Sequence, residues 1–312
     1  MATLFEKIVV VTRQTELDEL VHRFNTPAQA RFWLEQSGHS FDRIQKAHDK
    51  YRNVVSSVVS SFTADQKHQV IDRSIVPQFS FASDDLVVTI GQDGLVSNTA
   101  KYLDGQPVFA INPDPDLYDG VLLPFNAGEF HSYLQATLKG ESDRQNVTLA
   151  RAKSSDGQEL LAFNDFFIGA RSHVSARYEI EVSGRSETHS SSGIIVSTGA
   201  GSTGWLQSVY AGAAGVITAL GGTVTPPPDN GRLPWDSEQL VYSVREPFPS
   251  QVTQCSLVHG RLSAAEPLRL TSRMPANGVI FSDGVEADYL EFNSGASLTI
   301  APAGKRTVLL TK

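Results

Sequence analysis

Residues 86–94 of this chain read Leu-Val-Val-Thr-Ile-Gly-Gln-Asp-Gly, an apolar run that ends directly in a glycine-rich acidic segment. The apolar run predicts a buried strand, and the glycines predict a tight turn at its carboxyl end. Ligands of open α/β sheets bind outside the carboxyl ends of the strands, and glycine lets the backbone approach a phosphate closely. The segment therefore suggests phosphoryl chemistry, in which the carboxylate of Asp93 acts on a hydroxyl group.

A simpler role for Asp93 stays open at this point. Asp-Gly pairs are common turn formers, and the chain has four others, at 104–105, 119–120, 156–157 and 283–284. Position alone does not separate a catalytic aspartate from one that only completes a turn.

The composition limits the class of protein. The chain has 312 residues, enough for one large or two ordinary domains, and a net charge of −8. This charge argues against binding to nucleic acid or to an anionic membrane. A single cysteine, Cys255, excludes a disulfide framework and a thiolate metal cluster and favours a reducing compartment. We expect no resident metal, because no two of the histidines stand at ligand spacing on one helix.

No targeting or membrane segment is expected. Glu6 and Lys7 interrupt the first apolar stretch, which is therefore unlike a signal peptide. The longest apolar run, around 211–224, contains glycines and stops at the prolines 226–228, so it is too short to span a membrane. No Arg-rich leader precedes the first strand, and we expect a cytoplasmic protein.

The first 125 residues alternate between apolar runs and stretches with helical spacing. Thr26-Pro27 predicts a helix start, and Gly38 predicts the end of that helix. Strand–helix–strand order predicts an α/β domain with a parallel, doubly wound sheet over residues 1–125. We expect strands at 8–11, 66–76, 86–90 and 108–111, and further helices at 17–24 and 41–58.

The pattern changes after residue 125 to short strands separated by turn residues. Asp156-Gly157 predicts a hairpin between 147–152 and 158–163, and residues 176–182 alternate as a half-buried strand does. We expect a mostly antiparallel β domain over 126–285 with one glycine-broken helix near 203–220. The remaining segment, 286–312, is expected to return to the first domain.

A second glycine-rich stretch reads Ser-Thr-Gly-Ala-Gly-Ser-Thr-Gly-Trp over 197–205. Small residues with hydroxyl groups between a strand and a helix start form an anion pocket, although a flexible loop is the alternative. No lysine follows the last glycine, so the stretch is not a P-loop. Asn164-Asp165 follows another apolar run, where an amide beside a carboxylate can bind a ribose or a base edge or form a polar turn.

These three segments, in this order, resemble the NAD kinase family. Residues 91–95 are similar to its GGDGT motif, Asn164-Asp165 to its asparagine–glutamate pair, and 193–205 to its GLIVSTPTGSTAY strand and loop. Asp283-Gly284 fits its late Asp-Gly hairpin. The likeness is closest to the branch that contains the mitochondrial NAD kinases and covers almost the whole chain. It rests there on the helical insert 14–60 and the segments 112–115 and 167–180.

The resemblance implies an NAD kinase-like two-domain fold and ATP-dependent phosphorylation of the 2′-hydroxyl of the adenosine ribose of NAD, giving NADP. It implies that Asp93 is the general base and that magnesium accompanies ATP. It also implies a homodimer or homotetramer. The residues that it places at the bound nucleotides are Gly91, Gln92, Gly94, Asn112, Asn164, Asp165, Ser192, Thr198, Gly201, Ser202, Thr203, Gly204 and Trp205.

Several positions depart from the family pattern. Gln92 replaces a glycine, so a positive φ there would be costly, and Leu95 replaces a threonine near the phosphates. Asp165 replaces glutamate, Ser192 replaces an aspartate, and residues 199–200 replace a Pro-Thr pair.

Two alternatives stay open. The first is a kinase of the same superfamily with a lipid or sugar acceptor, against which the net charge and Asn164-Asp165 argue. The second is a non-catalytic regulator that binds NAD or NADP, which Gln92 and Leu95 motivate.

Overall fold

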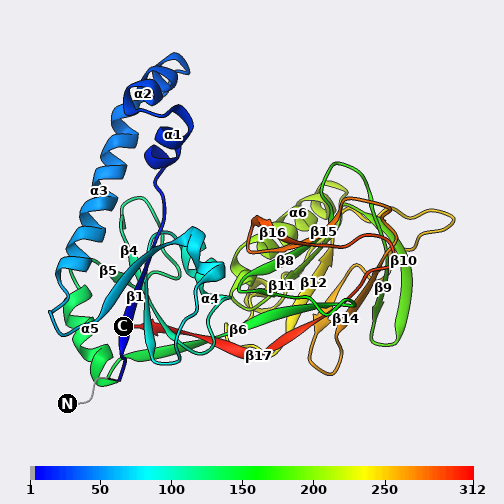
Figure 1. Ribbon diagram of the computed structural model, residues 1–312. Coiled ribbons are helices and arrows are strands. Elements are labelled where there is room, and N and C mark those ends of the chain that lie inside the picture. Colours follow the sequence, from blue (N-terminus) through cyan, green and yellow to red (C-terminus); the bar gives the residue numbers. More distant parts are fainter. Residues whose placement is uncertain (1–3) are drawn as a thin grey trace. The chain divides into compact units, whose positions relative to one another are not determined.

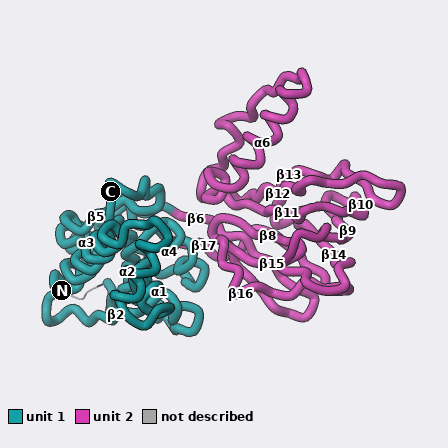
Figure 2. Tube along the Cα trace, turned by 90° about the horizontal axis from the view of Figure 1, so that it is seen from above, with its two compact units in different colours: residues 1–145, 308–312 teal, residues 146–307 magenta. Residues whose placement is uncertain are grey.

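The computed structural model describes residues 4–312 and divides the chain into two units (Figure 1, Figure 2). Unit 1 comprises the residues up to Gln145 together with 308–312, and unit 2 comprises Asn146–Thr307. The elements of unit 1 are β1 (Lys7–Thr12), α1 (Glu16–Phe24), α2 (Pro27–Gln36), α3 (Phe41–Ser60), β2 (His68–Asp72), β3 (Asp85–Ile90), α4 (Asp93–Ala100), β4 (Pro107–Asn112), β5 (Phe125–Asn126) and α5 (Phe130–Lys139).

Unit 1 is an α/β domain built on a parallel sheet. The strand order is β2-β1-β3-β4, and β4 also pairs in parallel with β5 and with the end of β17 (Ser297–Thr311). Every residue of β3 and β4 is buried, as expected for strands covered on both faces. The parallel sheet predicted from the sequence is confirmed.

The helices of unit 1 begin where the sequence places their caps. Thr26 accepts a hydrogen bond from the N–H of Gln29, and Pro27 is the first residue of α2. Thr15 and Asp18 form a capping box at the start of α1. Together α1, α2 and the first part of α3 enclose a small apolar core of their own (Figure 1). Its buried members are Leu17, Leu20, Ala30, Leu34, Phe41 and Ile44.

Unit 2 contains two sheets that share one apolar core. One sheet has the order β13-β12-β11-β8-β15-β16 and is antiparallel throughout. The other contains β10-β9-β14-β17 and the paired strands β6 and β7. The bounds are β6 (Asp143–Ser154), β7 (Glu159–Ala162), β8 (Asp165–Ala170), β9 (Ala176–Val182), β10 (Arg185–Ser191), β11 (Ile194–Ser197), α6 (Trp205–Ala219), β12 (Leu240–Val244), β13 (His259–Leu262), β14 (Leu268–Ser272), β15 (Gly278–Ser282) and β16 (Val285–Glu291).

The β-rich character of unit 2 confirms the expected fold class, an α/β domain plus a mostly antiparallel β domain. The hairpin at Asp156-Gly157 joins β6 to β7, with Ala150 opposite Ala162. Helix α6 lies where the glycine-broken helix was predicted, and in Figure 2 it stands away from the strands of its unit.

Two sequence expectations are corrected by the structure. The expected strand 66–76 ends at Asp72, whose side chain accepts a hydrogen bond from the N–H of Ser74 and starts a short 3₁₀ helix, Arg73–Gln78. Pro77 cannot donate to a strand ladder, which favours the change. Helix α5 was not expected, and Phe130 and Leu134 on it pack into the apolar core beside the parallel sheet.

The unit boundaries also differ from the expected 125/126 and 285/286. Helix α5 belongs to unit 1, while β16 and most of β17 belong to unit 2. Covering the parallel sheet requires an apolar helix, and α5 supplies it. Of the C-terminal segment 286–312, residues 308–312 return to unit 1, where Val308 pairs with Pro107 of β4.

Candidate active site

The glycine-rich segment after β3 starts helix α4 and does not form a left-handed turn. Gln92 precedes the helix with φ −85° and ψ 168°, an extended conformation open to any residue. The N–H of Gly91 donates to the carbonyl of Ile111 at 3.2 Å, which ties the end of β3 to β4. The cost expected at Gln92 therefore does not arise, and the N–H of Gly91 already has an acceptor.

Asp93 is the first residue of α4, and its side chain is half-buried. Oδ1 accepts a hydrogen bond of 2.6 Å from the backbone N–H of Leu122. The other carboxylate oxygen makes no hydrogen bond to any residue from 4 to 312. An anchored carboxylate with one open oxygen can take a proton from a hydroxyl group, as a general base must.

The neighbours of Asp93 divide into exposed and packed positions. Gly94 is exposed, with no atom within 4 Å of an added Cβ. Leu95 is buried, and its Cδ2 would lie 2.8 Å from a Cβ added at Gly91. The leucine that departs from the family motif therefore fills the space beneath Gly91 and is a packing residue.

Asn112 ends β4 and holds the loop that follows. Its Nδ2 donates to the carbonyl of Tyr118 at 3.0 Å, and its Oδ1 accepts from the N–H of Asp114 at 3.0 Å. The side chain is buried, so its predicted place at a nucleotide would require this loop to change.

In unit 2, the glycine-rich loop 197–204 packs tightly against neighbouring backbone. A Cβ at Gly199 would lie 1.9 Å from the carbonyl oxygen of Pro234, and one at Gly201 would lie 2.1 Å from that of Asn164. Neither glycine has a positive φ. Their small size, and not their conformational freedom, is what the fold requires at these two positions.

All three predicted binding hydroxyls in this loop donate within the protein, and the Oγ1 of Thr203 does so to the carbonyl of Ala200 at 3.2 Å. The Oγ1 of Thr198 donates to the carbonyl of Phe163 at 2.6 Å, and the Oγ of Ser202 donates to that of Gly199 at 2.6 Å. Both side chains are buried. Thr203 and Gly204 are exposed at the start of α6, so they are the residues of this loop that solvent or a ligand can reach.

Asp283 joins the end of β7 to the hairpin between β15 and β16. Its carboxylate accepts hydrogen bonds from three successive N–H groups, those of Phe163 at 3.0 Å, Asn164 at 2.6 Å and Asp165 at 3.3 Å. This cradle fixes the Asn164-Asp165 pair that the sequence singled out. The turn itself has φ 53° at Asp283 and φ 70° at Gly284, as a two-residue hairpin loop requires.

The Asp165 carboxyl group is buried beside Asp283. Burial, together with the negative charge of Asp283, raises the pKa of Asp165 from its usual 3.8 to about 7. Two carboxylates this close cannot both ionise easily without a compensating donor. Near neutral pH, Asp165 can therefore carry a proton and donate a hydrogen bond, whereas Asn164 is half-buried and offers both donors and an acceptor.

Unit 2 also contains a cavity of about 570 Å³ with aromatic walls. The rings of Phe167 and Trp205 lie 9° from parallel with centroids 6.0 Å apart. The Cζ of Arg245 lies 5.5 Å from the Trp205 ring, and that of Arg171 lies 5.0 Å from the Tyr289 ring. Flat rings flanked by guanidinium groups suit a heteroaromatic ring that carries phosphate.

Ser192 and Trp205 are the predicted residues that line this cavity. Arg245 stands at a strand end, directly after the run 240–244, and this position is the sequence signal that could have indicated it. Glu246, also on the wall, has φ 43°, a conformation that non-glycine residues adopt at a cost and that often marks a functional site. The aromatic and charged wall residues that the sequence analysis missed are Phe167, Arg171, Arg245, Glu246, Phe281, Glu286 and Tyr289.

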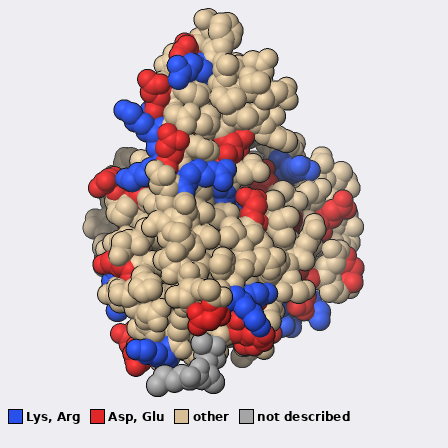
Figure 3. Space-filling model, turned by 60° about the vertical axis from the view of Figure 1, so that its left-hand side comes forward, with Lys and Arg blue, Asp and Glu red and all other residues tan. Residues whose placement is uncertain are grey.

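Other kinds of site have little support in the described residues. Within residues 4–312, no cluster of three or more metal-ligating side chains is found, and no helix is long and apolar enough to cross a membrane. On the face drawn in Figure 3, acidic and basic side chains are interspersed and do not gather by sign.

The chain therefore has a two-domain fold that combines a parallel α/β domain, in which an acidic helix start follows a central strand, with a β domain that contains an aromatic cavity. The fold is that of the NAD kinases. It matches yeast NADH kinase, solved with NADH, at a TM-score of 0.62 and 14% identity, over 98% of this chain and 83% of that chain. It matches an NAD kinase from Archaeoglobus fulgidus, solved with ATP, at a TM-score of 0.54 and 15% identity, over 97% and 92%. No family profile and no curated protein matches the sequence.

Proposed function

We propose that this protein is an NAD kinase, which transfers the γ-phosphoryl group of ATP to the 2′-hydroxyl of the adenosine ribose of NAD and forms NADP. The observation that carries the proposal is Asp93, a half-exposed carboxylate at the carboxyl end of a central strand, anchored through one oxygen by Leu122. The shared fold of proteins solved with NADH and with ATP supports the choice of both substrates.

In this proposal Asp93 accepts the proton of the ribose 2′-hydroxyl while the oxygen of that hydroxyl attacks the γ-phosphorus of ATP. The bond from the γ-phosphorus to the β–γ bridging oxygen breaks, and ADP leaves. Magnesium enters as part of the Mg–ATP substrate and neutralises charge on the phosphates. Anchoring by Leu122 keeps the carboxylate in one orientation, which lowers the entropic cost of reaching the reactive geometry.

Unit 2 would hold the dinucleotide in this scheme. The aromatic cavity offers Trp205 and Phe167 for a flat ring, and Arg171 and Arg245 for pyrophosphate. Asn164 and the protonated form of Asp165 would provide hydrogen bonds to hydroxyl or base groups. These assignments keep the predicted residues Ser192, Asn164, Asp165, Thr203, Gly204 and Trp205 as candidates for contact with NAD.

The test is NADP formation from NAD and Mg–ATP, read through an NADP-specific dehydrogenase, with Asp93→Asn measured in parallel. We expect turnover by the variant to fall by about 100- to 10,000-fold, the usual contribution of a general base. Its thermal midpoint should stay unchanged. Asp104→Asn, in a second Asp-Gly pair of unit 1 that is exposed, is the control and should keep full activity. Full activity of Asp93→Asn would overturn the base assignment.

The reasons for a non-catalytic regulator weaken with the structure. Gln92 is unstrained and Leu95 is buried, so Gln92 adds no backbone strain beside Asp93 and Leu95 serves packing. NAD binding without NADP formation by the native chain would nevertheless restore that alternative.

Helix α6 carries an exposed apolar surface that bears on oligomerisation and on a second candidate function, that of a lipid kinase. Exposed apolar side chains gather near its end, with Val216 61%, Ile217 43% and Leu220 83% exposed. An apolar surface of this kind suits either a second copy of the chain, as in a homodimer or homotetramer, or a lipid acceptor. We expect the homo-oligomer in the cytoplasm. Light scattering that gives a monomer, together with phosphorylation of diacylglycerol but not NAD, would favour the lipid kinase.

A further inference from the structure

Arg13 lies at the ligand edge of the parallel sheet, beside the segment that carries Asp93. It follows the last residue of β1, a strand that pairs in parallel with β3, where Val11 lies opposite Thr89. A Cβ added at Gly91 would lie 3.6 Å from the Cδ of Arg13. The stem of the arginine therefore passes directly over the glycine that ends β3.

The backbone of Arg13 is fixed by Tyr51 of α3. The phenolic oxygen of Tyr51 accepts from the N–H of Arg13 at 2.9 Å and donates to the carbonyl of Ile90 at 3.0 Å. Burial raises the pKa of Tyr51, so its phenol stays neutral and can donate. One buried hydroxyl thus ties the carboxyl ends of β1 and β3 together and holds Arg13 in place.

The guanidinium group of Arg13 has only neutral partners among residues 4–312. Nη1 donates to the carbonyl of Gln14 at 3.2 Å, and Nη2 donates to the hydroxyl of Tyr118 at 3.3 Å. Its Cζ lies 5.4 Å from the centre of the Tyr51 ring. Nε is buried and makes no hydrogen bond within the described chain.

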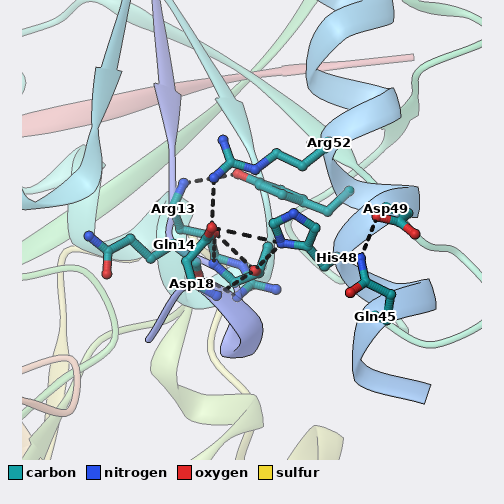
Figure 4. Close-up of polar contacts among 9 residues, drawn as sticks. Arg13, Gln14, Asp18, Gln45, His48, Asp49 and Arg52 are labelled. Carbon is teal, nitrogen blue, oxygen red and sulfur yellow. Dashed lines mark hydrogen bonds and ion pairs between the residues drawn. The ribbon is translucent and has the colours of Figure 1, made fainter. Parts of the chain in front are cut away.

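Two cations of α3, Arg52 and Lys50, are paired with carboxylates. Arg52 donates to Asp18 at 2.8 Å, and Lys50 donates to Asp114 at 2.5 Å. Figure 4 shows Arg52 on α3 directed at Asp18, with His48 beside it. The contrast with Arg13 is therefore local: its neighbours have acidic partners, and it has none in the described residues.

A half-buried guanidinium group without a counterion is costly, because burial removes water that no anion replaces. A bound anion would supply the missing charge and an acceptor for the open donors. Guanidinium groups bind phosphate through paired, charge-assisted hydrogen bonds. The position beside Gly91 places Arg13 at the edge of the sheet where phosphates are expected.

We propose that Arg13 binds the polyphosphate chain of the nucleotide donor, with Tyr51 and Tyr118 as the residues that position it. This inference rests on the proposed function, because it names the group that holds the donor of the same reaction. The inference predicts different effects on the two substrates. Loss of Arg13 weakens binding of the phosphate donor and leaves the affinity for NAD unchanged.

The test measures binding of inorganic tripolyphosphate by calorimetry, and KM for ATP and for NAD, in Arg13→Met, Arg13→Lys and Arg52→Met. Loss of a charge-assisted hydrogen bond weakens binding by about 10- to 100-fold, and we expect this loss for tripolyphosphate and for ATP in Arg13→Met. Arg13→Lys should lie between Arg13→Met and the native chain. Arg52→Met, which removes a nearby arginine that already has an acidic partner, should match the native chain.

Unchanged tripolyphosphate affinity in a folded Arg13→Met variant would overturn the inference. If that variant does not fold, Arg13→Gln keeps donors toward Tyr118 and Gln14, and it must show the same loss of tripolyphosphate affinity. Failure of the proposed function looks different. A native chain that binds tripolyphosphate through Arg13 but makes no NADP keeps the anion site and loses the kinase assignment. NADP formation with an unchanged KM for ATP in Arg13→Met would support the kinase assignment and reject the role of Arg13 in donor binding.

Discussion

The two glycine-rich segments of this protein look alike in sequence and differ in physical purpose. Both follow a buried strand and precede a helix. In unit 1, Gly94 is exposed, with open space where a side chain would be. In unit 2, Gly199 and Gly201 are buried against the carbonyl oxygens of Pro234 and Asn164. The first segment leaves backbone accessible, whereas the second lets two pieces of backbone pack against each other.

The carboxylates next to the two segments differ in the same way. Asp93 is half-buried with one anchored oxygen, whereas Asp165 is buried beside Asp283 and has a raised pKa. A glycine-rich motif therefore does not by itself distinguish a ligand contact from a packing requirement. Substitutions that add a single methyl group separate the two cases.

Gly201→Ala tests the packed segment, and we expect it to have the largest effect among the substitutions that add a single methyl group. The new Cβ would lie 2.1 Å from the carbonyl oxygen of Asn164, and backbone on both sides cannot move away as a flexible side chain can. We expect a loss of about 3 kcal/mol or more in the free energy of unfolding, at the upper end for overpacking. Urea denaturation measures it.

Gly212→Ala is the matched control in the same unit. An added Cβ there has no atom within 4 Å, and the residue lies inside α6. Alanine is the better helix former, so this change should stabilise by up to about 1 kcal/mol. Equal stability of Gly201→Ala and Gly212→Ala would show that the packed loop is not tight in solution.

The buried carboxylate predicts a pH dependence. Because the pKa of Asp165 is raised from 3.8 to about 7 in the folded state, the folded state binds the proton more tightly than the unfolded state. Its contribution to stability is complete below about pH 4 and is lost as pH rises to about 7, by an amount on the order of 4 kcal/mol. Thermal midpoints from pH 4 to pH 8 measure this loss.

Asp165→Asn removes the charge and should flatten most of this decline. Asp236→Asn, at an exposed position of the same unit, serves as the control and should retain the native pH profile. A decline that persists in Asp165→Asn would place the titrating group elsewhere.

Gly94→Ala tests the open segment and has the smallest expected effect on stability. The position is exposed in the first turn of α4, and its φ is not positive, so alanine should change stability by no more than about 1 kcal/mol, in the favourable direction. A raised KM for ATP at unchanged stability would show that this glycine serves a phosphate. No change in either quantity would mean that Gly94, like the packed Gly199 and Gly201, does not serve a ligand.

Much of the fold can be predicted from the sequence, because buried strands and helix starts leave short, local patterns of residues. The continuous apolar runs of β3 and β4, and the Thr26-Pro27 cap, identify parallel strands and a helix start without reference to distant residues. Helix α5 was not predicted, because the burial of Phe130 and Leu134 depends on the sheet that they cover and not on a local sequence pattern. The second half of the expected strand 66–76 was predicted wrongly, because the side chain of Asp72 accepts a hydrogen bond from the N–H of Ser74 and starts a 3₁₀ helix there.

The candidate site divides along the same line. The sequence by itself determined which segments carry polar residues at strand ends, and thus Asp93, Asn164 and Asp165, and it singled out Trp205 after the second glycine-rich stretch. Only the tertiary structure decided which of them are open to a ligand. It showed that the hydroxyls of Thr198 and Ser202 are used internally, and it brought Arg13 next to Gly91. Accessibility and charge pairing depend on contacts between residues far apart in the chain, and no local pattern records those contacts.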